Sequence, residues 1–320
     1  MNNICNEYCY NNSDVIGKGS YSIVYKGINS KTNENVAIKK IVSNKNDKYI
    51  FNEIHILNQF KNTDNIINLH NYYNIDNIIY LVFNCCSISL DKFIKQNICI
   101  KEDLAQNYFS QIVNGLKTLY NNNIYHRDIK PQNILIENNI IYLCDFGLSK
   151  FISNCDDNII KQSIVGSPLF MSPEIYNNLE YDLKSDLWSL GLVLFEMLSG
   201  YNYLYSNNIT ELISKIKDKD VPNINNISFE CSNLLLKLLT KNIDERIEWK
   251  DLFKHKWLIP NDKIYKLSND KISIDKVKNS SFSSDISSDE FLILSTEQEF
   301  DKTYSINNSF SFNDIFELFS

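Results

Sequence analysis

The chain has 320 residues, of which 43% are hydrophobic and 22% charged, and its formal net charge is −7. This length allows a large buried core, and the negative charge argues against a dedicated nucleic-acid binder. The longest nearly apolar stretch, residues 187–198, is shorter than the roughly 20 residues that span a membrane, so we expect no membrane insertion.

The N-terminus has neither the basic start nor the apolar core of a secretory signal. The eight cysteines are scattered without a Cys-x-x-Cys pair, which argues against a zinc site. We therefore expect a cytoplasmic protein with reduced thiols. Abundant Asn and Ile, both encoded by AT-rich codons, point to a protist or a large DNA virus, and for a virus the location is the host cytoplasm.

Residues 1–13 are polar, and we predict that they form a flexible N-terminal arm. The next part of the chain has alternating and β-branched runs, which are typical of strands. These runs are residues 22–26, 36–41 and 80–83. One helix is predicted near residues 47–60, where Ile50, Ile54 and Leu57 recur at helical spacing. A small β-rich unit with one helix is therefore expected first.

From residue 104 onward helical patterns dominate. Residues 187–198 are apolar on nearly every side, so this helix should lie at the centre of the core. Other helices are predicted from the stripe Tyr108, Ile112, Leu116 and Leu119 and from residues 234–239. Short strand-like pieces lie at residues 134–136 and 140–143.

The composition changes after Pro260, where Ser, Asn and acidic residues take over. Residues 280–320 hold eight acidic side chains and one basic one, so this segment carries the whole charge imbalance. We predict an acidic, disordered tail over residues 259–320.

The first motif with chemical meaning is a pair of glycines between two predicted strands. Glycines there let backbone N–H groups face phosphate oxygens. The candidate residues are Ile16, Gly17, Lys18, Gly19, Ser20 and Val24. Ser22 stands where the third glycine of this pattern is usual. By itself the pair also fits an ordinary hairpin turn.

Lys39 ends the run Val-Ala-Ile-Lys on a predicted strand. From there it can reach the α- and β-phosphates of a nucleotide, while Ala37 leaves room for an adenine ring. Such a lysine needs an anion to orient it. Glu53, 14 residues further on in the predicted helix, is the candidate. Either charged residue alone also fits an ordinary surface position.

Residues 126–133 read His-Arg-Asp-Ile-Lys-Pro-Gln-Asn, and Asp-Phe-Gly follows at residues 145–147. With these two motifs the sequence resembles the eukaryotic protein kinases. The resemblance implies that Asp128 is the catalytic base, that Asn133 and Asp145 hold Mg²⁺, and that ATP is the nucleotide.

The resemblance covers residues 14–258 and implies an α+β, bilobal kinase fold. Its parts would be a β-rich N-lobe at residues 14–83, a hinge at residues 84–86 and a helical C-lobe at residues 87–258.

The same resemblance implies further contacts to the nucleotide. Phe83 would be the gatekeeper that closes the back of the adenine pocket, and Cys86 would offer its backbone N–H and C=O to adenine. Asn84 and Leu135 belong to the same set. Cys144, which precedes the Asp-Phe-Gly motif, fits a small apolar wall better than a redox switch.

Two structural roles are also implied. Residues 171–174, Met-Ser-Pro-Glu, match the family's Ala-Pro-Glu element with Ser172 in place of Ala. Glu174 should then form a buried ion pair with Arg246. Asp186 should accept backbone N–H bonds from the catalytic loop.

Lys130, two residues after Asp128, is the choice of serine/threonine kinases, because it can neutralise the γ-phosphate during transfer. Ser167 stands where these kinases place a hydroxyl near both side chains. Arg127 is typical of kinases regulated by a phosphorylated activation segment. Ser163 is the predicted phosphosite, and the alternative is an ordinary loop serine.

The string at residues 166–174, together with Gln132 and Ser22, resembles the autophagy-initiating ULK-like kinases. In the tail, Phe291 and Leu294 follow acidic residues, which is similar to short motifs that add a strand to ubiquitin-like autophagy adaptors. The alternative is an incidental hydrophobic spot.

The leading interpretation is an active serine/threonine protein kinase acting on protein substrates. The first rival is a pseudokinase scaffold that binds nucleotide and partners without catalysis. A pseudokinase typically lacks one or more of the motif residues that are charged or would hold a metal ion. In this chain all five are present: Lys39, Glu53, Asp128, Asn133 and Asp145. The second rival is a small-molecule phosphotransferase, which would lack the peptide platform of residues 167–174.

Overall fold

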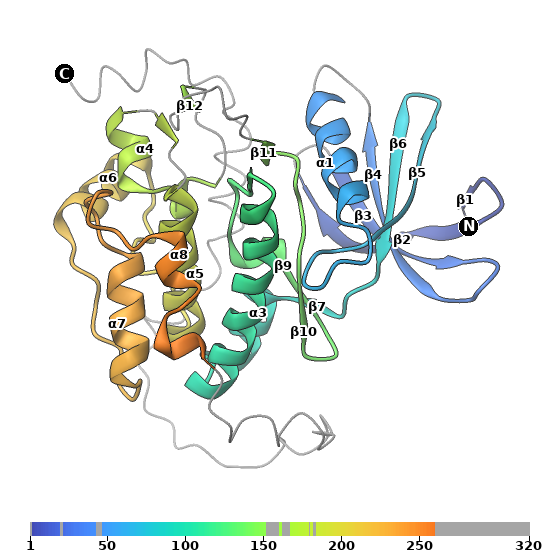
Figure 1. Cartoon of the computed structure of the whole chain (residues 1–320). Coiled ribbons are helices and arrows are strands. Elements are labelled where there is room, and N and C mark those ends of the chain that lie inside the picture. Colours follow the sequence, from blue (N-terminus) through green and yellow to red (C-terminus); the bar gives the residue numbers. More distant parts are fainter. Residues whose placement is uncertain are drawn as a thin grey trace. The chain divides into compact units, whose positions relative to one another are not determined.

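The first part of the chain forms an antiparallel sheet of six strands in the order β1-β2-β3-β4-β6-β5, with the helix α1 beside it (Figure 1). The strands are β1 (Asn2–Ile4), β2 (Tyr8–Lys18), β3 (Ser22–Asn29), β4 (Asn35–Val42), β5 (Leu69–Ile75) and β6 (Ile78–Asn84), and the helix is α1 (Asp47–Gln59). This computed structural model describes residues 2–19, 22–42, 47–151, 160–161, 167–178, 180–181 and 184–259.

Each face of this sheet carries a buried hydrophobic cluster, and the period of two along a strand assigns each side chain to a face. On β4, Ile41 belongs to the main hydrophobic core together with Ile50 and Leu57 of α1. Its neighbours Val36 and Ile38 belong to a separate cluster on the other face. The helix α1 therefore covers one face, as the Ile50, Ile54 and Leu57 spacing predicts.

The prediction of a flexible arm at residues 1–13 is wrong. The strands β1 and β2 pair with each other and bury Ile4, Tyr8 and Tyr10, each no more than 3% exposed. The ring of Tyr10 lies 4.7 Å from that of Tyr25, centroid to centroid, within the second cluster. Tyrosine carries a polar hydroxyl, but its ring buries a large apolar area. Polar residues on both sides of the two tyrosines hide this pattern in the sequence.

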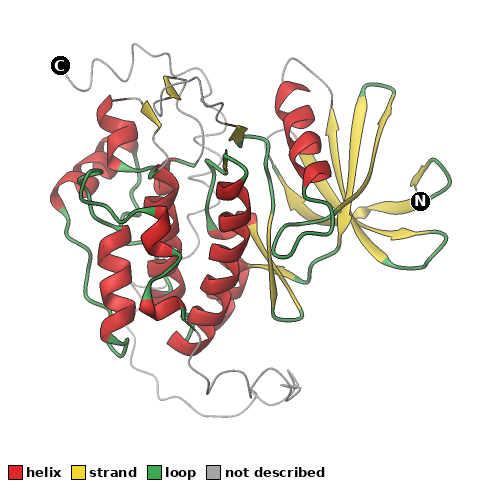
Figure 2. Ribbon diagram, in the orientation of Figure 1, coloured by secondary structure: helices red, strands yellow, loops and turns green. Residues whose placement is uncertain are grey.

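The rest of the described chain is mainly helical (Figure 2). The helices are α2 (Leu90–Asn97), α3 (Glu102–Asn121), α4 (Pro173–Asn178), α5 (Ser185–Ser199), α6 (Ile209–Asp218), α7 (Phe229–Leu238) and α8 (Trp249–Leu252), with 3-10 turns at Pro131–Asn133, Pro168–Phe170 and Lys256–Leu258. The short strands are β7 (Ile88–Ser89), β8 (Ile124–Tyr125), β9 (Ile134–Glu137), β10 (Ile140–Leu143), β11 (Lys150–Phe151), β12 (Ile160–Lys161) and β13 (Glu180–Tyr181).

The helix α5 is the centre of this helical lobe. Every residue from 185 to 198 is buried, which confirms the prediction for residues 187–198. The helix ends at Gly200, whose φ of +84° is the left-handed conformation that favours glycine. The chain's three tryptophans, Trp188, Trp249 and Trp257, are all buried in this lobe.

Side-chain caps fix the starts of two other helices. Asn208 accepts a hydrogen bond from the backbone N–H of Glu211 at the start of α6, and Ser228 accepts one from that of Cys231 at the start of α7.

The α+β bilobal fold is therefore confirmed. None of the helices in the described part of the chain combines the length and the apolar character that crossing a membrane requires.

Candidate active site

Three charged side chains from distant parts of the sequence meet between the sheet and the helical lobe. The ammonium of Lys39 on β4 lies 3.0 and 2.9 Å from the two carboxylate oxygens of Glu53 on α1. It also lies 3.0 Å from Oδ1 of Asp145, which follows β10 by two residues. Glu53 is 3% exposed, whereas the side chain of Asp145 is 46% exposed. Lys39 therefore binds one carboxylate oxygen of Asp145, while part of the carboxylate stays accessible to solvent or a ligand.

This arrangement favours the charged forms of Lys39 and Asp145. Burial disfavours the ammonium form of Lys39, but the carboxylates of Asp145 and Glu53 outweigh it and raise the pKa of the lysine. The positive charge of Lys39 in turn lowers the pKa of Asp145. Lys39 stays a cation and Asp145 an anion at neutral pH, which is the state that phosphate and metal binding need.

A second cluster surrounds Asp128, which is 8% exposed. Its Oδ1 accepts hydrogen bonds from the backbone N–H and the hydroxyl of Ser167, both at 3.1 Å. Its Oδ2 accepts from Nδ2 of Asn133 at 2.8 Å and lies 3.0 Å from the ammonium of Lys130. Lys130 also donates to the Ser167 hydroxyl at 2.5 Å. The carboxylate is thus oriented from both sides and within reach of a hydroxyl donor.

The loop that carries this cluster is held by Asp186 of α5, which is 1% exposed. Its two carboxylate oxygens accept the backbone N–H groups of His126 and Arg127 at 2.9 and 3.0 Å. Arg127 and Asp145 both have a φ of +66°, which is uncommon for residues other than glycine and costs backbone energy. The bonds from Asp186 hold the strained Arg127 in place.

Glu174 and Arg246 form a buried pair beneath the cluster. Two parallel hydrogen bonds of 2.8 Å join the guanidinium to the carboxylate. Ser185 donates a third bond of 2.8 Å to Glu174. Arg246 is 2% exposed. The pair ties α4 to the loop between α7 and α8, and the bond from Ser185 ties α4 to the start of α5.

The described residues that are predicted to contact the nucleotide lie on the glycine hairpin, β4, β6, the hinge and β9. In the hairpin, Gly17 pairs with Val24, and the N–H of Gly19 donates to the Ser22 carbonyl at 2.8 Å. Ile16 is 39% exposed. Lys18 lies at the end of β2 and is exposed.

Four half-buried side chains pack against the main hydrophobic core: Ala37 on β4, Leu135 on β9, and Cys86 and Cys144, which follow β6 and β10. Phe83 lies opposite Ala37 in the β4–β6 register and is 8% exposed. Asn84 closes β6 and donates its backbone N–H to the Asn68 carbonyl at 3.4 Å. Burial raises the pKa of the Cys144 thiol, and burial with Glu137 nearby raises that of Cys86 to about 12. Both thiols stay neutral.

Four of the predicted residues lie outside the described part of the chain. They are Ser20 of the glycine hairpin, Ser163 of the activation segment, and Phe291 and Leu294 of the tail.

Two residues near the site have no counterpart in the sequence predictions. Asn52 on α1 donates to backbone carbonyls of the segment after Asp145. The hydroxyl of Ser149 donates to the carbonyl of His126 at 3.1 Å. Both contacts join a side chain to a backbone group, and such contacts leave no spacing or charge pattern that a sequence reveals.

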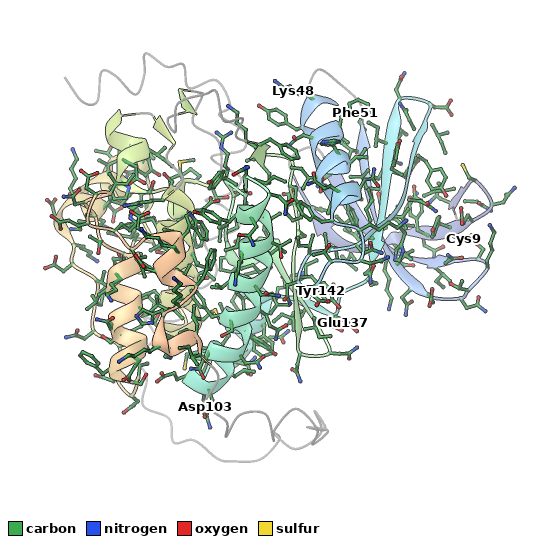
Figure 3. The ribbon with its side chains drawn as sticks, viewed as in Figure 1. Cys9, Lys48, Phe51, Asp103, Glu137 and Tyr142 are labelled. Atoms are coloured by element: carbon green, nitrogen blue, oxygen red, sulfur yellow. The ribbon has the colours of Figure 1, made fainter. Side chains whose placement is uncertain are left out.

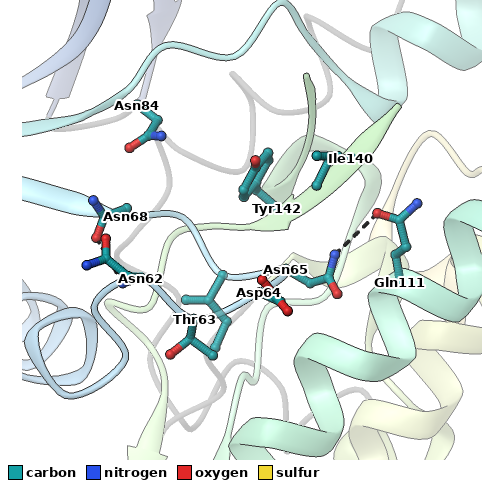
Figure 4. A pocket seen from close by; sticks show the side chains of 10 residues that line it. Asn62, Thr63, Asp64, Asn65, Asn68, Asn84, Gln111, Ile140 and Tyr142 are labelled. Atoms are coloured by element: carbon teal, nitrogen blue, oxygen red, sulfur yellow. Dashed lines mark hydrogen bonds between the residues drawn. The ribbon is translucent and has the colours of Figure 1, made fainter. Parts of the chain in front are cut away.

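A hollow of about 440 Å³ lies behind the hinge (Figure 4). Five of its ten lining residues carry amide side chains, and two of these, Asn65 and Gln111, bond to each other. Asn65 donates to Gln111 at 3.3 Å and to the Ile141 carbonyl at 3.0 Å, and accepts from Asn114 at 2.9 Å. The hollow therefore belongs to the packing of α3 against β10 and is separate from the two charged clusters.

The donor set fits a hard divalent cation beside a nucleotide. Asp145 offers an anionic oxygen on its exposed side. The amide nitrogen of Asn133 donates hydrogen bonds to the backbone carbonyl and to Oδ2 of Asp128. Its amide oxygen is therefore the atom that can bind a cation. Carboxylate and amide oxygens are the ligands that Mg²⁺ prefers.

Comparison with known proteins agrees with this geometry. The family model described as protein kinase domain matches residues 10–258. The chain is 38% identical to the serine/threonine-protein kinase atg1 of Dictyostelium discoideum over 267 residues, which cover 78% of this chain and 39% of that relative.

It is 33% identical over 270 residues to the serine/threonine-protein kinase unc-51 of Caenorhabditis elegans, covering 78% of this chain and 31% of that protein. It is 34% identical over 258 residues to the serine/threonine-protein kinase ULK3 of Mus musculus, covering 77% and 54%. The chain thus spans less than two thirds of the length of each relative.

Proposed function

The chain belongs to the protein kinase family, and from that premise we propose that it transfers the γ-phosphate of ATP to serine and threonine hydroxyls of proteins. The observation that carries the proposal is the Asp128 cluster, where a buried carboxylate, a lysine ammonium and a hydroxyl lie within 3.1 Å of one another. The same cluster supports an active enzyme over a pseudokinase scaffold.

Asp128 orients the attacking hydroxyl and accepts its proton. Its Oδ1 already accepts a hydroxyl hydrogen bond from Ser167, which supports this role. Lys130 lies beside it and offsets negative charge on the transferring phosphoryl group. Lys39, held by Glu53, binds the α- and β-phosphates. Lys130 donates a hydrogen bond to the Ser167 hydroxyl. Because serine/threonine kinases place a lysine and a hydroxyl at these two positions, the bond supports serine and threonine over tyrosine as acceptor residues.

Asp145 and Asn133 are the proposed Mg²⁺ ligands. A bound Mg²⁺ would neutralise the β- and γ-phosphates. Asp145 supplies an anionic oxygen, because Lys39 lowers its pKa. Asn133 supplies an uncharged oxygen and keeps Asp128 in place through its amide nitrogen.

Labelled phosphate transfer from MgATP to a mixture of serine, threonine and tyrosine peptides tests the proposal. We expect serine and threonine labelling that Asp128→Asn lowers by about a thousandfold. Nucleotide binding should survive in that variant. Nucleotide binding by the wild-type chain without any transfer would favour the pseudokinase scaffold instead.

The proposal includes control by phosphorylation of Ser163 through Arg127, as the family resemblance suggests. Phosphate mapping and the turnover of Ser163→Ala test it, and undiminished turnover would refute this control.

We further propose a role in autophagy-related signalling in the cytoplasm. The 38% identity with atg1 supports the first point. The free thiols among the described cysteines suit a reducing compartment. Capture by ubiquitin-like adaptors, compared between the full chain and its Phe291→Ala/Leu294→Ala variant, tests the tail motif. Equal capture would refute it.

A further inference from the structure

Asn52 is a half-buried residue of α1 that directly precedes Glu53. Its side-chain nitrogen lies 2.7 Å from the carbonyl oxygen of Ser149, 3.2 Å from that of Phe146 and 3.4 Å from that of Gly147. An amide nitrogen carries two hydrogens, so three backbone acceptors converge on two donors. The side chain therefore binds the backbone of one short segment, residues 146–149.

That segment is a turn with its own internal bond. The N–H of Ser149 donates to the Phe146 carbonyl at 3.1 Å. A second anchor comes from the catalytic loop, because the Ser149 hydroxyl donates to the His126 carbonyl. The ring of Phe146 is fully buried, 5.1 Å from the His126 ring. Asn52 is thus the polar link by which α1 joins a turn that the catalytic loop already holds.

Asn52 and Glu53 are neighbours on one helix, so any shift or rotation of α1 moves both. Glu53 links α1 to Lys39, and Lys39 links to the side chain of Asp145. Asn52 links α1 to the backbone that follows Asp145. We infer that Asn52 is a positioning residue that couples the place of α1 to the orientation of Asp145. The inference rests on the proposed function, which makes Asp145 a metal ligand.

The alternative is that Asn52 only fills space between α1 and the turn. Packing between these parts also comes from His55, whose ring lies 5.5 Å from that of Phe151. The two explanations differ in what they require of residue 52. Space filling needs its shape, whereas positioning needs its N–H groups.

Asn52→Asp separates them, because aspartate keeps the shape but turns an oxygen toward three carbonyl oxygens. Asn52→Gln keeps the donors on a longer side chain and serves as the rescue variant. The matched control is Asn58→Asp, which makes the same change on an exposed position of the same helix. Lys48 and Phe51 mark the exposed side of α1 in Figure 3.

The first readout is ADP affinity by calorimetry, with and without Mg²⁺. We expect Asn52→Asp to lower the Mg²⁺-dependent gain in affinity about tenfold, with Asn52→Gln in between and Asn58→Asp within about twofold of wild type. Mg²⁺-free ADP binding should stay within about twofold in all variants. A Mg²⁺-dependent gain in Asn52→Asp equal to that of the control would overturn the inference.

The second readout needs neither nucleotide nor activity. Hydrogen exchange of the Ser149 amide should become about tenfold faster in Asn52→Asp and not in Asn58→Asp. Unchanged exchange would also overturn the inference. Absence of phosphate transfer by the wild-type chain would count against the proposed function alone, because exchange reports the coupling directly.

Discussion

The buried pair of Glu174 and Arg246 is held by more than its two charges. The guanidinium donates to the carbonyls of Thr240 and Lys184 at 3.0 Å each and lies 5.4 Å from the ring of Trp188. Removing one partner of such a pair leaves the other charge buried and uncompensated. The pair is therefore sensitive to single substitutions.

We expect Glu174→Gln to lower the free energy of unfolding at pH 7 by about 3 kcal/mol. Burial opposes ionisation of Glu174, but Arg246 outweighs it and holds the pKa of the carboxyl below its ordinary 4.5. A lowered folded-state pKa stabilises the fold above the unfolded pKa and loses this effect as the pH falls through the folded value. The difference between the two proteins should therefore shrink below pH 4.5.

Urea unfolding at several pH values measures this difference. The matched control is Glu211→Gln, because Glu211 forms an exposed pair with Lys215, and exposed pairs contribute little. An equal loss in the two variants would contradict the prediction.

The cysteines should differ sharply in reactivity. Burial and Glu137 raise the pKa of Cys86 to about 12, and burial raises that of Cys144. Thiolate, the reactive form, is therefore scarce at both positions. Cys5 and Cys99 are exposed. Brief alkylation at neutral pH, mapped by mass spectrometry, should label Cys5 and Cys99 well before Cys86 and Cys144, and the reverse order would contradict this.

At the scale of elements, the hairpin of β1 and β2 contributes to the stability of the sheet. Tyr10 is 3% exposed and packs on Tyr25 and Tyr80. We expect Tyr10→Ala to lower the free energy of unfolding by about 3 kcal/mol, the usual cost of removing a buried ring. Tyr72→Ala is the control, because Tyr72 is 51% exposed on β5 of the same sheet. Similar unfolding curves for the two variants would mean that the hairpin is dispensable.

The end of α5 depends on glycine. A Cβ at residue 200 would lie 1.7 Å from the carbonyl oxygen of Ile98, and the φ of +84° is strained for other residues. We expect Gly200→Ala to cost at least about 2 kcal/mol of unfolding free energy.

Gly17→Ala is the control for Gly200→Ala in the same thermal and urea measurements. A Cβ there would meet Val24 only at an ordinary 3.6 Å. Equal stability of the two variants would show that the loop at Ile98 adapts freely.

At the scale of the whole molecule, the α+β fold and its central helix could be predicted, because a long apolar run and helical spacing are local signals. The N-terminal strands could not, because their few buried side chains, Ile4, Tyr8 and Tyr10, are flanked in the sequence by Asn and acidic residues. The motifs pick out residues that lie together in the structure, such as Lys39 and Asp145. The contacts of Asn52 could not be predicted from the sequence, because its hydrogen-bond partners are backbone carbonyls.

The placement of the tryptophans gives the helical lobe an optical signal of its own. The three tryptophans lie in the helical lobe, so tryptophan emission follows the unfolding of that lobe. The sheet has no tryptophan but holds a tyrosine cluster, in which burial raises the pKa of Tyr8, Tyr10 and Tyr73. Burial also raises the pKa of Tyr108, Tyr142 and Tyr203 in the helical lobe, so delayed alkaline ionisation of phenols reports buried tyrosines of both lobes. Tryptophan emission is therefore the signal that follows the helical lobe by itself, without any label.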